Sequence, residues 1–459
     1  MRVLLTQPVS NFGLRNVVGM KSPPLGLAYV GAAAERVGCE VKVIDSASIG
    51  LSNRQLIDRI VEYEPDVLGV GTTTMGYTEG LSLVSSVKER KPRTFTVMGG
   101  PHVTFTDEET LRQCAGLDAV VRGEGEKTFE ELLMAVQSRA SLSAVEGLTY
   151  RVNGDITRNP DRPRIQDLDA LGFAGYHLLP METYHMGRGN LFACMITSRG
   201  CPYACSFCSS SNLFGKKWRF RSPEHVVAEM EYLKDRFGCR EVEILDDTFT
   251  VSPQRADRIC ELLINKKWDL LWSASSRLGT LTLDMARKLK RAGCTTLYLG
   301  FESASQEVLD SLCKGVKLEE AFKTMEVVHK AGLRAIGSFI LGCPADTVET
   351  IKKTIRFARA LAPRYAQFTL LTPYPGTPLY GQALTSGLIA DNDWTKYTIV
   401  DPILRHPSIS ARKLKRYVNW AYVSFYLRPR YVFDELRDGS FYLVPRAFKA
   451  FVEHLAGRV

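Results

Sequence analysis

The chain has 459 residues, which indicates two or three domains that each bury their own core. Hydrophobic residues make up 45% of it and charged residues 24%, and no tract is repetitive or rich in Gly and Ser, so the composition argues against disorder. The net charge is +9, and residues 401–459 hold much of the excess, with eleven Lys or Arg residues against five acids.

The opening segment, MRVLLTQPVS, is too short for the apolar part of a signal peptide, and no stretch approaches the roughly 20 apolar residues that span a bilayer. We therefore expect a cytoplasmic protein. The eleven cysteines of such a chain are better interpreted as thiols or metal ligands than as disulfides, and only three of them cluster.

Residues 1–145 alternate between strand-like and helix-like segments. Strands are predicted at RVLLTQP, CEVKVID, DVLGVGTTT, TFTVMGG and LDAVVRGEGE, and helices at GLAYVGAAAERVG and NRQLIDRIVEYEP. This alternation predicts an α/β domain with a doubly wound, Rossmann-like parallel sheet, followed by a linker over residues 146–190. Such sheets bind ligands beyond the carboxyl ends of their strands.

Small and polar residues gather at those predicted strand ends. Glycine lets a bulky ligand approach the backbone, and threonine offers hydroxyl and amide groups. Turn glycines are the alternative interpretation. No G-x-G-x-x-G follows the first strand, so a dinucleotide site is disfavoured. The candidate ligand-binding residues are Gly71, Thr72, Thr73, Gly99, Gly100, His102, Gly123 and Glu124.

Three cysteines, Cys201, Cys205 and Cys208, lie in the segment SRGCPYACSFCSS. Their spacing does not suit a closed structural zinc site, which needs four ligands in pairs. Three thiolates instead suit a 4Fe–4S cluster with one iron left open for a small molecule. Clusters that only transfer electrons normally have four cysteine ligands, so this one is predicted to be reactive.

Residues 191–385 are predicted to form six strand-helix units. The strands are LFACMITSRG, REVEILDD, DLLWSASS, TTLYLGFES, LRAIGSFILG and AQFTLLTPYPG, and SPEHVVAEMEYLKDRFG is a helix with a Ser-Pro start and a Gly stop. The units predict a partial (β/α)6 barrel of the TIM type. Its active site is expected at the carboxyl ends of the strands, where the cysteines lie.

The cysteine motif, with Phe207 directly before its third cysteine, resembles the radical S-adenosylmethionine (radical SAM) family over about residues 191–380. The resemblance implies that the open iron binds S-adenosylmethionine and that an electron, from a donor such as flavodoxin or ferredoxin, cleaves it to a 5′-deoxyadenosyl radical. SPPLGLAYVGAAAE, GVGTTT, GGPHVT and VVRGEGE resemble the cobalamin-binding domain of class B methyltransferases and of the Mg-protoporphyrin cyclase and hopanoid methylase group. Because D-x-H-x-x-G is absent, His102 is expected to touch the cofactor's edge and not to bind cobalt.

The same resemblance implies roles for residues at the barrel mouth. Asp246 and Asp247 match the position that binds the methionyl ammonium, Glu302 and Ser303 a position near the ribose and amino acid, and Ser338, Ile340 and Gly342 the stretch along the adenine. Either aspartate could instead cap the following helix. Arg277 could hold the ligand's carboxylate or bridge surface acids. Carboxylates without a basic partner favour a cationic ligand.

Residues 386–459 form a basic, aromatic region with helical spacing, in SARKLKRYVNWAYVSFYLRPRYVFDEL and again in YLVPRAFKAFVEHLAGRV. One interpretation is a helical cap on the barrel, and another is peripheral contact with an anionic membrane surface or an amphipathic substrate. RNA contact is a third. No nucleic-acid-binding module follows the barrel, so a nucleic-acid partner is disfavoured.

Together these features predict a cobalamin-dependent radical SAM enzyme that methylates an unactivated carbon of a small, hydrophobic or lipid-like substrate. The alternative enzyme uses the same radical for ring closure, carbon–carbon bond formation or oxidation, without methyl transfer. A cobalamin or redox sensor without catalysis is a third hypothesis, and an open cluster iron argues against it.

Overall fold

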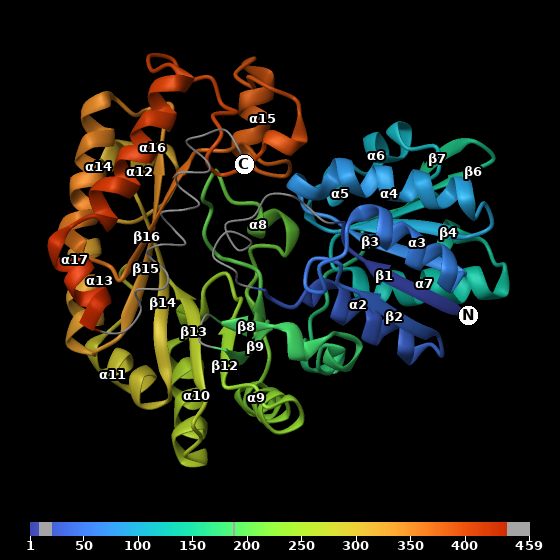
Figure 1. The fold of residues 1–459 in the computed structure, drawn as a ribbon, viewed down its shortest axis with the longest axis horizontal. Coiled ribbons are helices and arrows are strands. Elements are labelled where there is room, and N and C mark those ends of the chain that lie inside the picture. Colours follow the sequence, from blue (N-terminus) through green and yellow to red (C-terminus); the bar gives the residue numbers. More distant parts are fainter. Residues whose placement is uncertain (9–20, 187–188, 438–459) are drawn as a thin grey trace.

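The structure is a computed structural model that describes residues 1–8, 21–186 and 189–437 of the chain. Two seven-stranded sheets organise it, the first before residue 160 and the second after residue 184. Figure 1 shows the first sheet beside a second sheet that curls into a half-barrel, with α8 (Ser210–Leu213) between them.

The first sheet has the strand order β2-β1-β3-β4-β5-β6-β7. Its strands β1 to β5 are parallel, as the alternating pattern predicts. They span β1 (Arg2–Thr6), β2 (Glu40–Ile44), β3 (Val67–Gly71), β4 (Phe95–Gly99) and β5 (Ala119–Val121).

Both faces of this sheet are covered by helices. Val3 and Leu5 of β1 belong to one core cluster, with α2 (Leu25–Arg36) and α7 (Gly125–Ser138), whereas Leu4 belongs to the opposite cluster, with α3 (Asn53–Tyr63) and α4 (Tyr77–Arg90). Because strand side chains alternate between faces, an unbroken apolar run is what a doubly covered strand requires. The predicted doubly wound fold is confirmed.

Two further helices follow β4 in this part of the chain, α5 (Pro101–Thr104) and α6 (Asp107–Gln113).

The first sheet extends beyond residue 145. Strands β6 (Leu148–Val152) and β7 (Asp155–Arg158) form a hairpin that pairs with β5 in antiparallel fashion. The rest of the expected linker forms single helical turns at Asp169–Leu171, Tyr176–Leu178 and Met181–Thr183. The division of the chain at residues 145, 190 and 385 stays a prediction, and these strands place the hairpin on the first sheet.

The second sheet has the order β16-β15-β14-β13-β12-β9-β8. Six of its strands are parallel and coincide with the six predicted strands, so the partial (β/α)6 barrel is confirmed. They are β9 (Asn190–Met195), β12 (Glu241–Ile244), β13 (Leu271–Ser276), β14 (Cys294–Glu302), β15 (Arg334–Leu341) and β16 (Tyr365–Leu370), and the short β8 (His185–Met186) pairs antiparallel with β9.

Helices form the outer layer of the half-barrel (Figure 1). Ser222 caps the first of them and Gly238 ends it at a φ of 70°, which are the predicted start and stop. The helices are α9 (Pro223–Phe237), α10 (Pro253–Lys266), α11 (Leu283–Arg291), α12 (Gln306–Ser311), α13 (Glu319–Lys330) and α14 (Val348–Leu361).

The basic, aromatic region is helical where the structure describes it, in α16 (Ala411–Tyr426) and α17 (Pro429–Arg437), after α15 (Pro378–Thr385). The hydroxyls of Tyr422 and Tyr426 each donate a hydrogen bond to a backbone carbonyl of β16, at Phe368 and Ala366. These tyrosines therefore cap the half-barrel. The second predicted segment, residues 442–459, lies outside the described residues. Within the described ranges, no helix is long and apolar enough to cross a bilayer.

Candidate active site

The three cysteines lie in one loop at the carboxyl end of β9. A small antiparallel ribbon of β10 (Ser198–Arg199) and β11 (Arg219–Phe220) closes the base of this loop. Inside it, the amide of Cys208 donates to the carbonyl of Cys205 over 3.2 Å, and the amide of Cys201 donates to Gly215 over 3.1 Å. All three thiols are half-buried.

The cysteine loop is held against the half-barrel by its middle residues. The amide of Ser206 donates to the carbonyl of Leu312, and its own carbonyl accepts from the amide of Leu379 over 2.9 Å. Phe207 packs against an apolar cluster that includes Ile340, so the predicted adenine-side residue and the predicted cluster loop do meet.

The donor set, three thiols in one loop, fits an iron–sulfur cluster. Among the residues that the structure describes, no three His, Cys, Asp or Glu side chains converge on one point that could hold an ion. Thiolates of a 4Fe–4S cluster need not converge, since each binds a different iron. Burial, together with the charge of Asp247, raises the pKa of Cys201 and Cys208, and bound iron would offset this by favouring their thiolates.

Arg277 lies directly beside the cysteine loop. Its guanidinium stands 3.7 Å from the centre of the Tyr203 ring, and Nη1 is 3.9 Å from Sγ of Cys205. Nη2 donates to the carbonyl of Lys314. Bridging of surface acids, one of the two expected roles, is not what the structure shows. Arg277 therefore places a buried cation directly beside the middle cysteine of the motif.

The two neighbouring aspartates after β12 differ sharply. Asp246 is buried, and its carboxylate accepts four hydrogen bonds, from the amides and hydroxyls of Thr197 and Ser198 at 2.5–2.9 Å. Four bonds satisfy a carboxylate, so Asp246 ties the end of β9 to β12 and has no lone pair left for the expected ammonium.

Asp247 is exposed and accepts one described hydrogen bond, from the hydroxyl of Ser210, over 2.6 Å. Surrounding protein atoms that displace water raise its pKa, and the charge of Asp246 adds to this. No lysine or arginine pairs with it in the described part of the chain. Neither aspartate caps α10, because Ser252 does. Asp247 is thus the aspartate that is open to a cationic ligand.

Glu302 is buried and has a protein partner that the sequence did not indicate. Its Oε1 pairs with Nζ of Lys314 over 2.7 Å, and this ammonium lies 5.9 Å from the centre of the Phe207 ring. The hydroxyl of Ser303 lies 3.4 Å from that of Thr354 on α14 and accepts from the amide of Ser305. Ser303 therefore bonds within the helical layer.

The other predicted residues of β15 occupy different environments. Ser338 is half-buried, whereas Ile340 is buried in the apolar cluster beside the cysteine loop. Gly342 has a φ of 77°, and a Cβ there would lie 3.1 Å from the side chain of Leu414. The backbone conformation and close packing account for glycine at this position.

Backbone at three adjacent strand ends of the first sheet is open to a ligand. Thr73 and Gly123 are exposed, and Gly71 and Gly99 are half-buried. Thr72 is buried, and its amide donates to the carbonyl of Gly99 over 2.9 Å. Such an edge of accessible backbone fits a large cofactor.

Gly100 fixes the shape of that edge. It has a φ of 113°, and a Cβ there would collide with the backbone of Thr72. Glycine at this position therefore allows the ends of β3 and β4 to approach closely. This is expected both if Gly100 is simply a turn glycine and if it helps to bind a ligand.

His102 is buried in a cluster of aromatic side chains. Its ring centre lies 4.2 Å from that of Tyr77 and 4.7 Å from that of Trp394, which follows the half-barrel. Nδ1 is 3.2 Å from the hydroxyl of Thr74, and Nε2 has no hydrogen-bond partner in the structure. Burial lowers the pKa of His102 to about 4, so the ring is neutral. The expected contact with a cofactor edge stays a prediction, since the ring is buried here together with its Nε2.

Glu124, a predicted cofactor-binding residue, has a protein partner in the structure. Both carboxylate oxygens bind Arg219 of β11, and one also accepts from the amide of Ile165. Neighbouring Glu126 binds Arg199 of β10 in the same way. These ion pairs join the first sheet to the cysteine loop, and no sequence signal linked residues so far apart.

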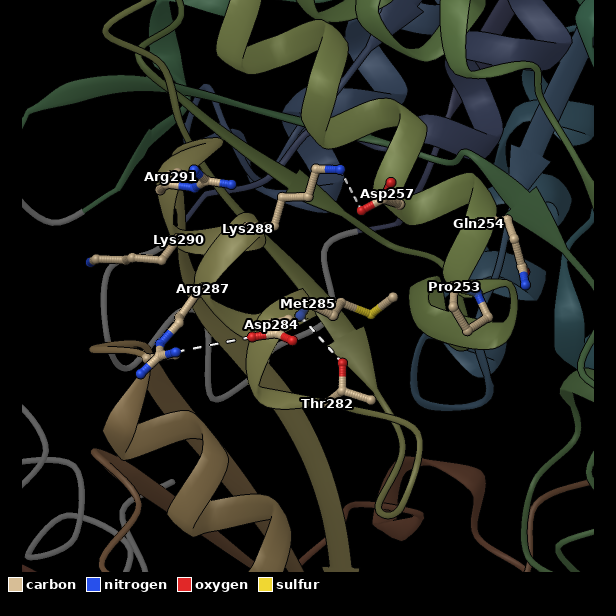
Figure 2. A pocket seen from close by; sticks show the side chains of 11 residues that line it. Pro253, Gln254, Asp257, Thr282, Asp284, Met285, Arg287, Lys288, Lys290 and Arg291 are labelled. Carbon is tan, nitrogen blue, oxygen red and sulfur yellow. Dashed lines mark hydrogen bonds and ion pairs between the residues drawn. The ribbon is translucent and has the colours of Figure 1, made fainter.

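A surface pocket of about 920 Å³ lies elsewhere, between α10 and α11. Figure 2 shows Lys288 reaching Asp257 across it and Arg287 turned toward Asp284. None of the predicted site residues lines this pocket, so it is separate from the candidate active site.

Two family models match the sequence, that of the Radical SAM superfamily over residues 195–358 and that of the B12 binding domain over residues 13–133. An uncharacterized methyltransferase, PH0819, of Pyrococcus horikoshii is 40% identical over 449 residues, which are 98% of this chain and 97% of that protein. The anaerobic magnesium-protoporphyrin IX monomethyl ester cyclase of Rubrivivax gelatinosus is 29% identical over 99% of this chain and 82% of its own.

Among solved structures, the chain resembles the radical S-adenosylmethionine methyltransferase TsrM of Kitasatospora setae, determined with cobalamin and a 4Fe–4S cluster bound. The TM-score is 0.71 at 18% identity, over 90% of this chain and 80% of that one. At this identity the likeness concerns the fold, which includes both the sheet of residues 2–158 and the half-barrel.

Proposed function

Since the chain belongs to the radical SAM enzymes that carry a B12 binding domain, we propose that it transfers a methyl group to an unactivated carbon of a hydrophobic or lipid-like substrate. Its cofactors are a 4Fe–4S cluster, S-adenosylmethionine and cobalamin. The observation that carries the proposal is the fastening of the cysteine loop to the carboxyl edge of the first sheet, which brings the two cofactor-binding regions together.

When bound, the cluster and S-adenosylmethionine supply a 5′-deoxyadenosyl radical, and cobalamin supplies the methyl group. Cys201, Cys205 and Cys208 would hold the cluster. Asp247, which is exposed and has no cationic partner among the described residues, would bind the ammonium of S-adenosylmethionine. Arg277, beside Cys205, would offset the negative charge of the thiolates.

An apolar cluster beside the cysteine loop supports a hydrophobic substrate. Phe207 and Ile340 meet Leu371, Leu379 and other buried apolar side chains there. These side chains pack against one another and give the cysteine loop apolar surroundings, which favour an apolar substrate over a charged one.

Ring closure or oxidation by the same radical is the second candidate. It is supported by the likeness to the Rubrivivax gelatinosus cyclase, which extends over 99% of this chain. Both candidates require the cysteine loop, Asp247 and the apolar cluster, so they differ only in whether a methyl group reaches the product.

The test is anaerobic reconstitution with iron, sulfide and cobalamin, followed by incubation with methyl-deuterated S-adenosylmethionine, reduced flavodoxin and a lipid extract. A lipid heavier by one deuterated methyl group, formed together with 5′-deoxyadenosine, is expected. Consumption of an extract component without methyl gain would support the second candidate. Cys205→Ala should abolish 5′-deoxyadenosine, and its persistence in that variant would contradict both.

The partners that we propose are an external electron donor, such as flavodoxin or ferredoxin, and an anionic membrane surface. Trp420, Leu427 and Phe433 are exposed on α16, α17 and the turn between them, and they support the membrane contact. Tyr422 and Tyr426 support the other interpretation, a cap on the half-barrel, for the opposite side of α16.

A further inference from the structure

The β10–β11 ribbon fixes the position of the first cysteine. Arg199 and Arg219 are register partners in this ribbon, and Cys201 follows Arg199 by two residues. Gly200 has a φ of 90°, and a Cβ there would lie 2.5 Å from the carbonyl oxygen of Lys217. Because the two ends of the loop touch through their backbones, a displacement of the ribbon displaces Cys201.

Both arginines of the ribbon are held by glutamates of the first domain. Glu124 binds Arg219 through contacts of 2.5 and 3.0 Å, and Glu126 binds Arg199 through contacts of 2.5 and 3.3 Å. Each is a two-pronged pair of planar groups, which fixes orientation as well as distance. All four side chains are buried.

The charge of Glu126 persists in spite of burial. Burial alone raises the pKa of Glu126, but the charge of Arg199 and its hydrogen bonds lower that pKa by more, so the carboxylate stays ionised. Buried pairs are also screened little by salt. The contact between Glu126 and Arg199 therefore joins two charged groups.

Glu124 and Glu126 are well placed to hold the cysteine loop at a fixed position relative to the first sheet. They follow β5 directly, at the carboxyl edge where a doubly wound sheet binds its ligand. We propose that these two glutamates are positioning residues, which clamp the ribbon and so hold the cysteine loop at a fixed place relative to the cobalamin-binding edge. The proposal rests on the cofactor sites of the proposed function, and it holds whether the product gains a methyl group or not.

The test compares the full chain with the variant E124Q/E126Q and with the control E130Q. Glutamine keeps the shape but leaves two buried arginines without a countercharge. Glu130 lies on the same helix, is buried and pairs with Arg36 within the first domain and its linker, so E130Q perturbs the helix without touching the ribbon.

Hydrogen–deuterium exchange of the cluster-free chains is the first readout. Amides of residues 200–218 are expected to exchange at least tenfold faster in E124Q/E126Q, a ratio equal to about 1.4 kcal/mol, and at the wild-type rate in E130Q. If the double variant does not fold, R199K replaces it, because lysine keeps the charge and loses the two-pronged contact.

The second readout is the electron paramagnetic resonance spectrum of the reduced, reconstituted protein with and without S-adenosylmethionine. A changed or heterogeneous cluster signal is expected in the clamp variant and a wild-type signal in E130Q, which a general loss of stability would not produce. Exchange within twofold of wild type over residues 200–218, together with an unchanged signal in a folded clamp variant, would overturn the proposal. Equal changes in E130Q would overturn it as well.

Discussion

Replacing Asp246 and Asp247 one at a time distinguishes an aspartate that holds the fold from one that is open to a ligand. Asp246→Ala removes the acceptor of four hydrogen bonds from Thr197 and Ser198, of which two come from backbone amides that cannot turn toward another partner. Asp247→Ala removes one described hydrogen bond, from the hydroxyl of Ser210.

The expected effects differ in kind. A buried amide left without an acceptor costs about 1–3 kcal/mol, and with two of them we expect Asp246→Ala to lose about 3–5 kcal/mol. At about 2–4 °C for each kcal/mol, Tm should fall by about 10 °C. Asp247→Ala concerns an exposed side chain and should change Tm by less than about 3 °C. Loss of one charge-assisted hydrogen bond, about 1.5–3 kcal/mol, should weaken S-adenosylmethionine binding about 10- to 100-fold.

Scanning calorimetry of the cluster-free chains measures Tm, and titration calorimetry of the chains reconstituted with iron and sulfide measures the affinity for S-adenosylmethionine. Asp247→Asn is the matched control, since it keeps the shape and removes only the charge, and it should also bind weakly. A wild-type Tm in Asp246→Ala would refute the stabilising role of the four hydrogen bonds. Wild-type affinity in both Asp247 variants would refute its role as the ammonium partner.

Three other changes have expected outcomes. Gly100→Ala places a Cβ against the Thr72 backbone at a φ of 113° and should cost about 2–5 kcal/mol, measured by thermal unfolding. Burial raises the pKa of Glu229 from 4.5 to about 7, so between these pH values the folded state holds a proton that the unfolded state releases. The free energy of unfolding should therefore fall by about 3 kcal/mol between pH 4.5 and 7. In Glu229→Gln, this dependence of Tm on pH should be lost. Replacing Trp420 and Phe433 with serine should reduce sedimentation with anionic vesicles at least threefold without changing Tm, and unchanged sedimentation would exclude membrane contact through this surface.

The fold could be predicted because its signals are local. An apolar run such as Val3–Leu5 describes a strand covered on both faces, and Ser222 and Gly238 mark the two ends of α9. The β6–β7 hairpin also has a local signal, which the linker interpretation passed over. Asn153 and Gly154 adopt φ values of 53° and 93° in its turn, and Asn-Gly is typical of such turns.

The site was predictable only as far as chemistry and spacing decide it. The three cysteines lie within eight residues of sequence, from Cys201 to Cys208. Their number and spacing indicate one kind of iron–sulfur cluster. The partner of Glu124 could not be found in this way, because Arg219 lies 95 residues further along the chain. Similarly, nothing near His102 in the sequence indicates that Trp394 covers it.

Asp246 and Asp247 show most clearly where sequence information ends. Both are acids after the same strand, and either matched the ammonium position equally well. What separates them is which neighbours donate hydrogen bonds, and this depends on how β9 and β12 lie side by side. A residue type states what a side chain can bind, whereas the fold decides whether that capacity is already used.

The charged groups at the barrel mouth differ in whether they have a partner of opposite charge. Lys314 is neutralised by Glu302, and Arg277 lies against Cys205, where a bound cluster would bring negative charge. Asp246 is satisfied by four donors. Among these groups, the carboxylate of Asp247 is the one without a described cationic partner, which is why we propose it as the site of a cationic group. Its Ser210 partner begins the short helix that follows Cys208, so a cationic group bound there would lie beside the cysteine loop.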